Sequence, residues 1–274
     1  MHIAVLLKQV PDTDEVRMDE KTGTMIREGA GTIINPFDLH ALQAALDLRQ
    51  HTGGRISVIS MGPPQAEKAL REAIALGADD ILFLSDPRFA AADTWATTKT
   101  LVAAIRKYGP FDLILAGEKA TDGETGQVGP EVAAMLDLPF STYVSGLVVQ
   151  EDGSVNVSRT VEEGIERQRL PLPCLLTVLR DLNEPVMPTL EGKKKGRRIR
   201  IQSKRLEDLG LDPEEVGLAG SPTRVVRIFH PQVERTPLSY RGKDLGRGIA
   251  QLVDELERRG LLTGGERYVD GQNA

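Results

Sequence analysis

The sequence predicts an α/β fold in three layers, in which helices cover both faces of a parallel sheet. Through residues 1–180, short runs of Ile, Val and Leu are bounded by turn residues or charges, as buried parallel strands are. Segments with apolar residues at helical spacing separate these runs, and this alternation is typical of such a sheet. Residues 181–240 show no sustained period, so we expect an extended arm there, followed by one C-terminal helix.

The expected strands follow the apolar runs. In the first half they lie at residues 3–7, 56–61, 81–84 and 113–116. From about residue 142 the pattern changes to strand-like pieces at 143–149, 155–161 and 174–179. Because consecutive strands often lie side by side, we expect these later pieces to extend the same sheet.

Helices are expected between the strands of the first half. The first begins at Asn35 and Pro36, because asparagine is a good cap and proline suits the first helical position. Leucines then recur at helical spacing. A second helix ends at Gly77, a third is capped by Asp93, and a fourth begins between residues 125 and 130. In the C-terminal region, apolar residues at helical spacing around residues 249–256 predict the last helix.

The bulk composition limits the function classes. A net charge of −6 is unlike that of a general nucleic-acid binder, which needs a basic surface to displace counterions. One cysteine, Cys174, allows no internal disulfide and fits a reducing compartment, and we expect it to be a small buried side chain. The apolar residues before Lys8 are too few for a signal peptide or a membrane span. We therefore expect a cytoplasmic protein that binds no nucleic acid and inserts into no membrane.

A basic run interrupts the otherwise acidic chain. Between Glu191 and Arg205 there are eight basic residues and one acidic residue, and no aromatic side chain that could stack on bases. We expect a solvated linker or a protein-docking face. An RNA-binding module is the alternative, and it would show a steep salt dependence of binding.

The loop at residues 117–130 is the strongest candidate for a ligand site. In an open parallel sheet, ligands bind beyond the carboxyl ends of the strands. Here Gly123, Gly126 and Gly129 let the backbone approach a ligand closely, and amides entering the next helix can donate to phosphate oxygens. The spacing matches neither the dinucleotide fingerprint nor a Walker A loop. The loop is therefore a candidate pyrophosphate cradle of another type.

Other features around this loop refine the expectation. Asp122 and Glu124 would repel a phosphate, so we expect them at ribose hydroxyls or as helix caps. Loops after the first, second and third strands open on the same edge and would converge with it on one crevice. Catalytic constellations are missing, because the histidines form no metal spacing and no serine or cysteine lies in a nucleophile elbow.

Six pieces of the chain, taken together, resemble the β subunit of electron-transfer flavoproteins, and they occur in the family's order. They are Lys8-Gln9-Val10-Pro11-Asp12-Thr13, Ile34-Asn35-Pro36-Phe37-Asp38, Met61-Gly62-Pro63-Pro64-Gln65-Ala66, Ala75-Leu76-Gly77-Ala78-Asp79, the run from Asp122 to Pro130, and Leu182-Asn183-Glu184-Pro185. The resemblance covers nearly the whole chain. It implies a Rossmann-like, adenine-nucleotide-binding domain at residues 1–180, and at 181–274 a partner-docking loop with an arm that wraps on an α subunit.

The resemblance also implies a heterodimer whose α subunit carries the electron-transferring FAD, while the β subunit binds a second nucleotide. Leu190 aligns with the leucine that anchors partner dehydrogenases. The residues that would hold the nucleotide are Lys8, Val10, Pro11, Asp12, Asn35, Asp38, Gly62, Thr94, Thr97, Gly117, Lys119, Asp122, Gly123, Glu124, Thr125, Gly126 and Gln127.

The identity of that nucleotide separates two groups within the family. The motifs around Val10, Thr94 and Asp122 resemble the electron-bifurcating group, in which FAD takes a hydride from NADH and passes electrons to a low-potential acceptor, such as ferredoxin or flavodoxin, and to an acyl-CoA or similar dehydrogenase. Glu118 and Gly126 depart from the pattern of that group. The alternative is a simple shuttle with structural AMP. A nucleotide-binding regulatory protein of the universal-stress type is an alternative of another class.

Overall fold

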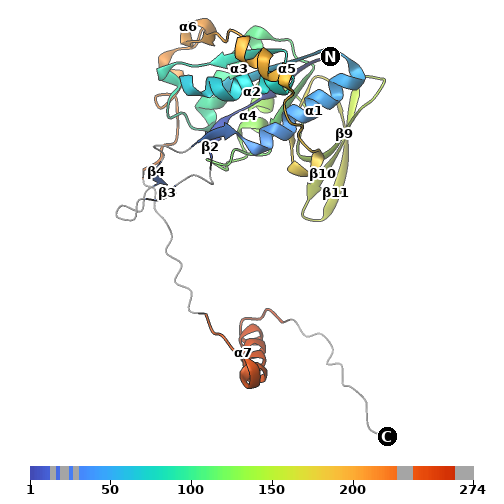
Figure 1. Ribbon diagram of the computed structural model, residues 1–274, viewed down its shortest axis with the longest axis vertical. Helices are drawn as coiled ribbons and strands as arrows, with labels where there is room; N and C mark the ends of the chain where they lie inside the picture. The colour runs from blue at the N-terminus through green and yellow to red at the C-terminus, as the bar shows by residue number, and fades with distance from the viewer. Residues whose placement is uncertain (13–16, 19–24, 27–30, 227–236, 263–274) are drawn as a thin grey trace. The chain divides into compact units, whose positions relative to one another are not determined.

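The computed structural model describes residues 1–12, 17–18, 25–26, 31–226 and 237–262. The chain forms two compact units, Met1–Phe229 and His230–Ala274. The first unit has the three layers expected, a sheet between two sets of helices (Figure 1). Thr13, in the first of the family motifs, lies outside the described residues.

A nine-stranded sheet forms the middle layer, in the order β11-β10-β9-β12-β8-β1-β6-β7-β13. Every neighbouring pair from β9 to β13 in this order is parallel. The expected strands are confirmed, including those that extend the sheet. The strands of the sheet are β1 (His2–Leu6), β6 (Arg55–Met61), β7 (Asp80–Leu84), β8 (Leu113–Gly117), β9 (Phe140–Val149), β10 (Ser154–Val161), β11 (Gly164–Pro171), β12 (Cys174–Val178) and β13 (Ser203–Lys204).

Four helices connect the strands and cover both faces. On one face, α1 (Pro36–Thr52) and α2 (Glu67–Leu76) pack through side chains such as Leu42 and Leu70. On the other, α3 (Thr94–Tyr108) and α4 (Val128–Leu136) pack through Val102 and Val132. The short helices are η2 (Pro64–Ala66), η3 (Pro87–Phe89), η4 (Arg180–Leu182), α6 (Leu206–Leu209) and η5 (Pro213–Glu215).

The helix starts predicted from the sequence are confirmed, but one cap works differently. Asp93 caps α3 as expected, because its side chain accepts from the Ala96 amide at 3.0 Å. Asn35 precedes α1, yet its side chain makes no capping hydrogen bond. Its amide is instead bound to the loop after β8. The proline at position 36 therefore starts the helix without a side-chain cap.

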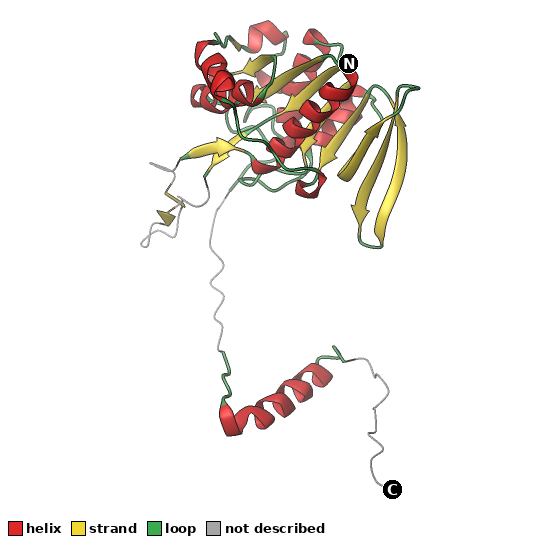
Figure 2. Cartoon of the chain, turned by 45° about the vertical axis from the view of Figure 1, so that its right-hand side comes forward, coloured by secondary structure: helices red, strands yellow, loops and turns green. Residues whose placement is uncertain are grey.

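At one edge, the sheet changes to an antiparallel hairpin that projects from the domain (Figure 2). Strand β11 was not expected, because it carries charged and polar residues and little apolar alternation. Its residues pair with β10 along its full length, from Gly164 to Pro171. Charged side chains on an edge strand discourage further pairing, so this composition suits its position. Separate two-stranded sheets pair β2 (Gln9–Pro11) with β5 (Thr32–Ile34) and β3 (Arg17–Met18) with β4 (Met25–Ile26).

The expectation of an extended arm from residue 181 is wrong for its first part. Helix α5 (Leu190–Arg198) packs against α2, with Gly192 and Gly196 so close to the α2 backbone that a side-chain carbon at either would collide with it. The Arg71 guanidinium donates to the carbonyls of Gly196 and Ile199 at 2.8 and 2.9 Å. Glycines and backbone carbonyls hold this helix, so it needs no apolar stripe.

After α5 the chain comes back to the sheet, and we call residues 200–225 the return segment. It adds β13 to the edge strand β7 and buries Leu206, Leu209 and Val216 against the core. These apolar residues are too widely spaced to produce a period in the sequence. The division of the chain at residue 180, into a nucleotide-binding domain and a partner-docking part, stays a prediction.

The second unit contains η6 (Gly242–Asp244) and the predicted C-terminal helix, α7 (Leu245–Arg258). The apolar residues of α7 fall on one face of the helix, and Leu245, Ile249 and Leu252 on this face are exposed. Such a face is stable in water when another surface covers it. Among the described helices, none combines the length and the apolar character needed to cross a membrane.

Candidate functional site

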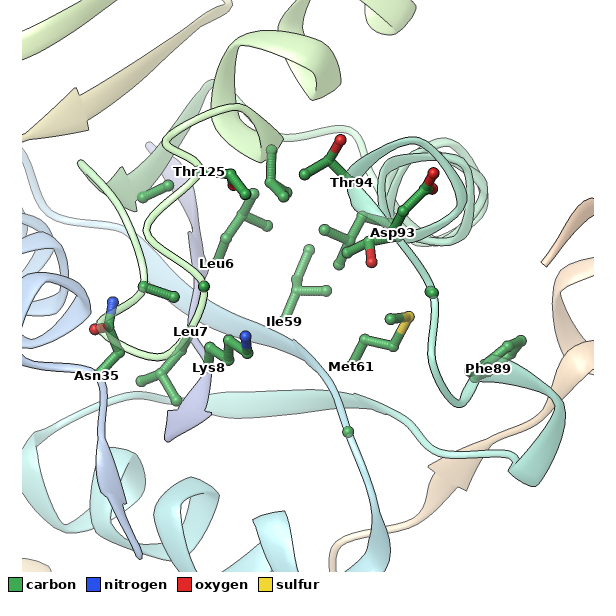
Figure 3. A pocket seen from close by; sticks show the side chains of 18 of the residues that line it. Leu6, Leu7, Lys8, Asn35, Ile59, Met61, Phe89, Asp93, Thr94 and Thr125 are labelled. Carbon is green, nitrogen blue, oxygen red and sulfur yellow. The ribbon is translucent and has the colours of Figure 1, made fainter. Parts of the chain in front are cut away.

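A cavity of about 1350 Å³ opens at the carboxyl ends of β1, β6, β7 and β8. Figure 3 shows its apolar floor, where Leu6, Ile59 and Met61 come from the first two of these strands. Helix connections change from one sheet face to the other around β1, which is where ligands bind in open α/β sheets. The cavity therefore occupies the position expected for a ligand site.

Most of the residues predicted for the nucleotide line this cavity. Loops from four separate strands bring them together, as the convergence argument expected. They are Lys8, Asn35, Asp38, Gly62, Thr94, Thr97, Gly117, Lys119, Gly123, Glu124, Thr125, Gly126 and Gln127.

Four predicted residues do not line the cavity. Val10 is buried where β2 pairs with β5, and Pro11 is in the same hairpin. The Asp12 amide donates to Gly31 as the hairpin ends. Asp122 faces Lys8, and its carboxylate accepts from the Lys8 Nζ at 2.7 Å. Val10, Pro11 and Asp12 therefore belong to a hairpin next to the cavity, and Asp122 balances the charge of Lys8.

Asn35 and Asp38 fix the loop after β8 to the start of α1. The Asn35 side chain donates to the Lys119 carbonyl at 2.8 Å and accepts from the Thr121 amide at 3.2 Å. Asp38 accepts from the amides of Lys8 at 2.7 Å and Gly117 at 3.1 Å. Both side chains thus use their polar atoms on backbone groups that end β1 and β8.

Burial raises the pKa of Asp38 to about 7, against the lowering effect of these two amides, of Asn35 and of Lys8. The carboxyl is nearly inaccessible, and an ion in such a place loses its hydration. Asp38 consequently titrates close to neutral pH at the wall of the cavity.

Three glycines give the loop its shape. At Gly117, a side-chain carbon would lie 2.5 Å from the Asp38 carboxylate and 2.6 Å from Phe37 Cβ. Gly126 has φ of +63°, a conformation that other residues adopt with strain. At Gly123, by contrast, a side-chain carbon would meet no described atom within 4 Å. The backbone at Gly123 therefore lies open to the cavity.

The cations at the loop carry their own counterions. Besides Lys8 with Asp122, the Lys119 Nζ lies 3.8 Å from the Glu124 carboxylate and 5.9 Å from the centre of the Phe37 ring. The expectation that Asp122 and Glu124 avoid a phosphate is compatible with these pairs, which direct both carboxylates toward lysines. Glu118 also lines the cavity, so this departure from the family pattern lies at the site itself.

The far wall of the cavity comes from residues that sequence reasoning missed. Asp93 holds the return segment, accepting from the Thr223 amide and hydroxyl at 2.9 and 2.8 Å. Burial opposes ionisation of Asp93, but amide and hydroxyl donors outweigh it and lower its pKa. Asp86 pairs with the Arg88 guanidinium, which lowers the pKa of Asp86, and it also accepts from the Leu206 amide. The return-segment residues that line the cavity are Ile201, Ser203, Arg205, Pro222, Thr223 and Val225.

The starts of α3 and α4 meet beside the loop. The Thr94 hydroxyl donates to the Glu131 carboxylate at 3.0 Å, and the Thr98 hydroxyl donates to its other oxygen at 3.0 Å. Gln127, Val128 and Gly129 line the cavity at the start of α4, where the first turn offers the Val128 and Gly129 amides, because Pro130 has no amide hydrogen. A helix start with free amides favours an anionic ligand there.

Leu190 lies apart from the cavity, at the first position of α5, with 81% of its surface exposed. Met187, three residues earlier in the sequence, is 83% exposed. Thr189 caps the helix by accepting from the Gly192 amide, and the Val186 amide donates to Gln43 of α1. A firmly held segment thus presents apolar side chains to solvent, as a docking element does.

Redox-active or metal-binding side chains do not gather at the site. Within the described ranges, no group of three His, Cys, Asp or Glu residues is placed to hold a metal ion. Cys174 is buried in β12, as the sequence predicted, and burial raises its pKa to about 12. A thiol with that pKa stays protonated and unreactive near neutral pH.

Comparisons with known proteins agree with the geometry. A sequence model described as "Electron transfer flavoprotein domain" matches residues 22–207. The "Electron transfer flavoprotein subunit beta" of Thermoanaerobacterium thermosaccharolyticum is 44% identical over 263 residues, which cover 96% of this chain and 100% of that protein. The "Caffeyl-CoA reductase-Etf complex subunit CarD" of Acetobacterium woodii has the same identity and coverage. The "Protein FixA" of Bradyrhizobium diazoefficiens is 42% identical over 247 residues, 87% of this chain and 86% of that protein. The chain therefore belongs to the electron-transfer flavoprotein family, and within it to the β subunits.

Proposed function

We propose that this β subunit holds FAD in the cavity and works in electron bifurcation, with NADH as the hydride donor. The observation that carries the proposal is the cavity itself. At about 1350 Å³ it exceeds the usual range of about 300–1000 Å³ for small-molecule pockets, so it has room for more than a mononucleotide. The similarity to a relative named as a subunit of a caffeyl-CoA reductase complex also supports the proposal of electron bifurcation.

The residues present fit a nucleotide. The first turn of α4 offers amides to a phosphate, and the backbone at Gly123 leaves space for its approach. Lys8 and Lys119 stand at the same place, and their partners Asp122 and Glu124 limit the net positive charge there. The apolar floor suits a ring system, because it excludes water from the faces of the ring.

When bound, FAD would supply the redox chemistry, accepting a hydride from NADH and releasing the two electrons to different acceptors. The protein binds and orients. Asn35 and Asp38 fix the loop that receives the pyrophosphate, and Thr94 is fixed by Glu131 at the opposite helix start. The return segment closes the far wall against water. None of these side chains needs to take part in a covalent step.

An α subunit completes the proposed assembly. The exposed apolar face of α7 is a suitable contact for it, since this face otherwise stays in water. The expected acceptors are an acyl-CoA or similar dehydrogenase and a low-potential carrier such as ferredoxin or flavodoxin. Membership of the electron-transfer flavoprotein family removes the alternative of a universal-stress-type protein.

Counting nucleotides tests the proposal. The chain is co-purified with its α-type partner, the nucleotides are released with acid, and FAD and AMP are quantified per heterodimer. Two FAD and no AMP are expected. One FAD and one AMP would reject bifurcation and support the simple shuttle with structural AMP.

Leu190→Ala tests the docking role of α5 separately. Loss of a central apolar anchor at an interface costs about 1–2 kcal/mol or more, so reduction of the dehydrogenase should slow while flavin content stays unchanged. Lys194→Ala, which changes an exposed residue of the same helix, serves as the control. Equal kinetics for wild type and Leu190→Ala would remove Leu190 from the interface.

A further inference from the structure

The cavity has two cationic ends that differ in how their charges are balanced. At the loop end, Lys8 and Lys119 each have a carboxylate partner. At the return-segment end, Arg205 lines the cavity, and no carboxylate in the described part of the chain lies within ion-pair distance of its guanidinium. Ser203 lines the same end and brings a hydroxyl group. This end thus offers an uncompensated cation with a polar neighbour.

The acidic groups near Arg205 are occupied elsewhere, two of them close in sequence and one, Asp86, brought near through its contact with the Leu206 amide. Asp86 and Glu207 both pair with Arg88, at 2.6 and 2.7 Å. The Asp208 carboxylate accepts from the Arg205 backbone amide at 2.8 Å. The guanidinium is therefore left for a ligand, and its planar donors match a phosphate group.

The two ends are too far apart for one pyrophosphate. The loop follows β8 and Arg205 follows β13, and these strands are four places apart in the sheet. With strands spaced by about 4.8 Å, the backbone of β8, which carries the loop, and the backbone of β13, which carries Arg205, are about 19 Å apart across the sheet. The two phosphates of a dinucleotide share one oxygen atom, so they cannot reach both ends. Two anion positions so far apart indicate two ligands.

We propose that Arg205 binds a phosphate group of a second nucleotide, the pyridine dinucleotide, at the return-segment end of the cavity. This inference rests on the proposed function, which requires NADH to approach the nucleotide held by the loop. Arg205 acts as a binding residue for the substrate, and the loop holds the resident cofactor. The return segment then contributes to substrate affinity as well as to the fold.

The test uses the purified heterodimer with Arg205→Ala, Arg205→Lys and, as a control, Arg200→Ala, which changes an exposed arginine of the same segment that does not line the cavity. NADH binding is measured by calorimetry at low and high salt, together with FAD content. A hydrogen bond to a charged group is worth about 1.5–3 kcal/mol, so Arg205→Ala should weaken NADH binding about ten- to hundredfold. Arg205→Lys should restore part of the affinity, and Arg200→Ala should leave it unchanged.

Other outcomes separate the inference from the function on which it rests. Two FAD per heterodimer with unchanged NADH affinity in Arg205→Ala would reject the role of Arg205 and leave the proposed function standing. Loss of FAD in Arg205→Ala would also reject it, because the arginine would then hold the resident nucleotide. One FAD and one AMP in the wild-type heterodimer would reject the proposed function itself.

Discussion

The cavity has a loop end, formed by the loop after β8, and a return-segment end, formed by residues 200–225, and different contacts hold the two ends in place. At the loop end, glycines set the backbone of the loop after β8, and Asn35 and Asp38 bind this loop to the start of α1 from 84 and 79 positions away. The return-segment end is built by residues more than a hundred positions apart, through Asp86 with Leu206 and Asp93 with Thr223. Both ends therefore depend on long-range side-chain contacts, and the loop end has in addition a cluster of glycines that is visible in the sequence.

The carboxylates at the two ends also respond to acid in opposite ways. The raised pKa of Asp38 means that its contribution to stability is full below about pH 3.8 and is lost as the pH rises through about 7. The lowered pKa of Asp93 means that its contribution is present above pH 3.8 and is lost as the pH falls through the lowered value. Mild acid should thus favour the loop end, and strong acid should release the return segment.

The largest effect is expected for Asp38→Asn, which removes this titration. Between pH 3.8 and about 7 the wild-type stability should fall by about 4 kcal/mol more than that of the variant, because one pKa unit corresponds to about 1.4 kcal/mol. Chemical unfolding at several pH values measures the difference. Asp93→Asn, as the control, should change the profile in the acid range alone. Parallel profiles for wild type and Asp38→Asn would contradict the buried charge at this position.

Gly117→Ala tests the tight backbone of the loop end. The new methyl group would collide with Phe37 and with the Asp38 carboxylate, so the loop must move. Overpacking of this kind costs about 1–3 kcal/mol and should also displace the nucleotide. Thermal unfolding and nucleotide content are the measurements. Gly123→Ala provides the matched control for stability alone, because its methyl group enters open space where the protein makes no contact. Equal stability of the two variants would show that the loop is not held against α1.

Asp93→Ala tests the return-segment end. It removes the cap of α3 and the acceptor for Thr223, so about 1–2 kcal/mol of stability should be lost. Proteolysis should then cut the return segment first, and Asp93→Asn should be milder because asparagine caps equally well. Protection of residues 213–223 equal to that in the wild type would mean that other contacts hold this segment.

The contrast between the two ends explains what sequence reasoning could and could not find. Strands β1, β6, β7 and β8 and the loop at 117–130 were predicted, because buried apolar runs and clustered glycines are local signals. Arg205 and Thr223 were missed as site residues, because their position depends on the path of the return segment. The sequence showed the basic run between Glu191 and Arg205, but no hydrophobic pattern within it indicated that β13 joins the edge of the sheet.

Helices α5 and α7 show the same limit. The apolar stripe of α7 predicted a helix. Helix α5 carries mostly charged residues, and two glycines that lower helix propensity turn out to be its packing surface. A contact made through backbone atoms leaves no hydrophobic pattern in the sequence. The roles of individual residues toward a nucleotide likewise stay predictions, since lining a cavity and binding its ligand are separate properties.

The smallest effect on stability is expected for Gly123→Val, the change that most directly tests the loop as a cradle. No described atom lies within 4 Å of a Cβ built at this position, so the free energy of unfolding should stay within about 0.5 kcal/mol of the wild type. The same open space is where the backbone would approach the ligand, so the nucleotide should be released. Gel filtration followed by nucleotide analysis measures retention. The fluorescence of Trp95, the one tryptophan of the chain and a cavity-lining residue, reports ligand entry in the isolated chain. A variant that keeps both its stability and its full nucleotide content would place the phosphate away from Gly123, leaving the first turn of α4 as its binding position.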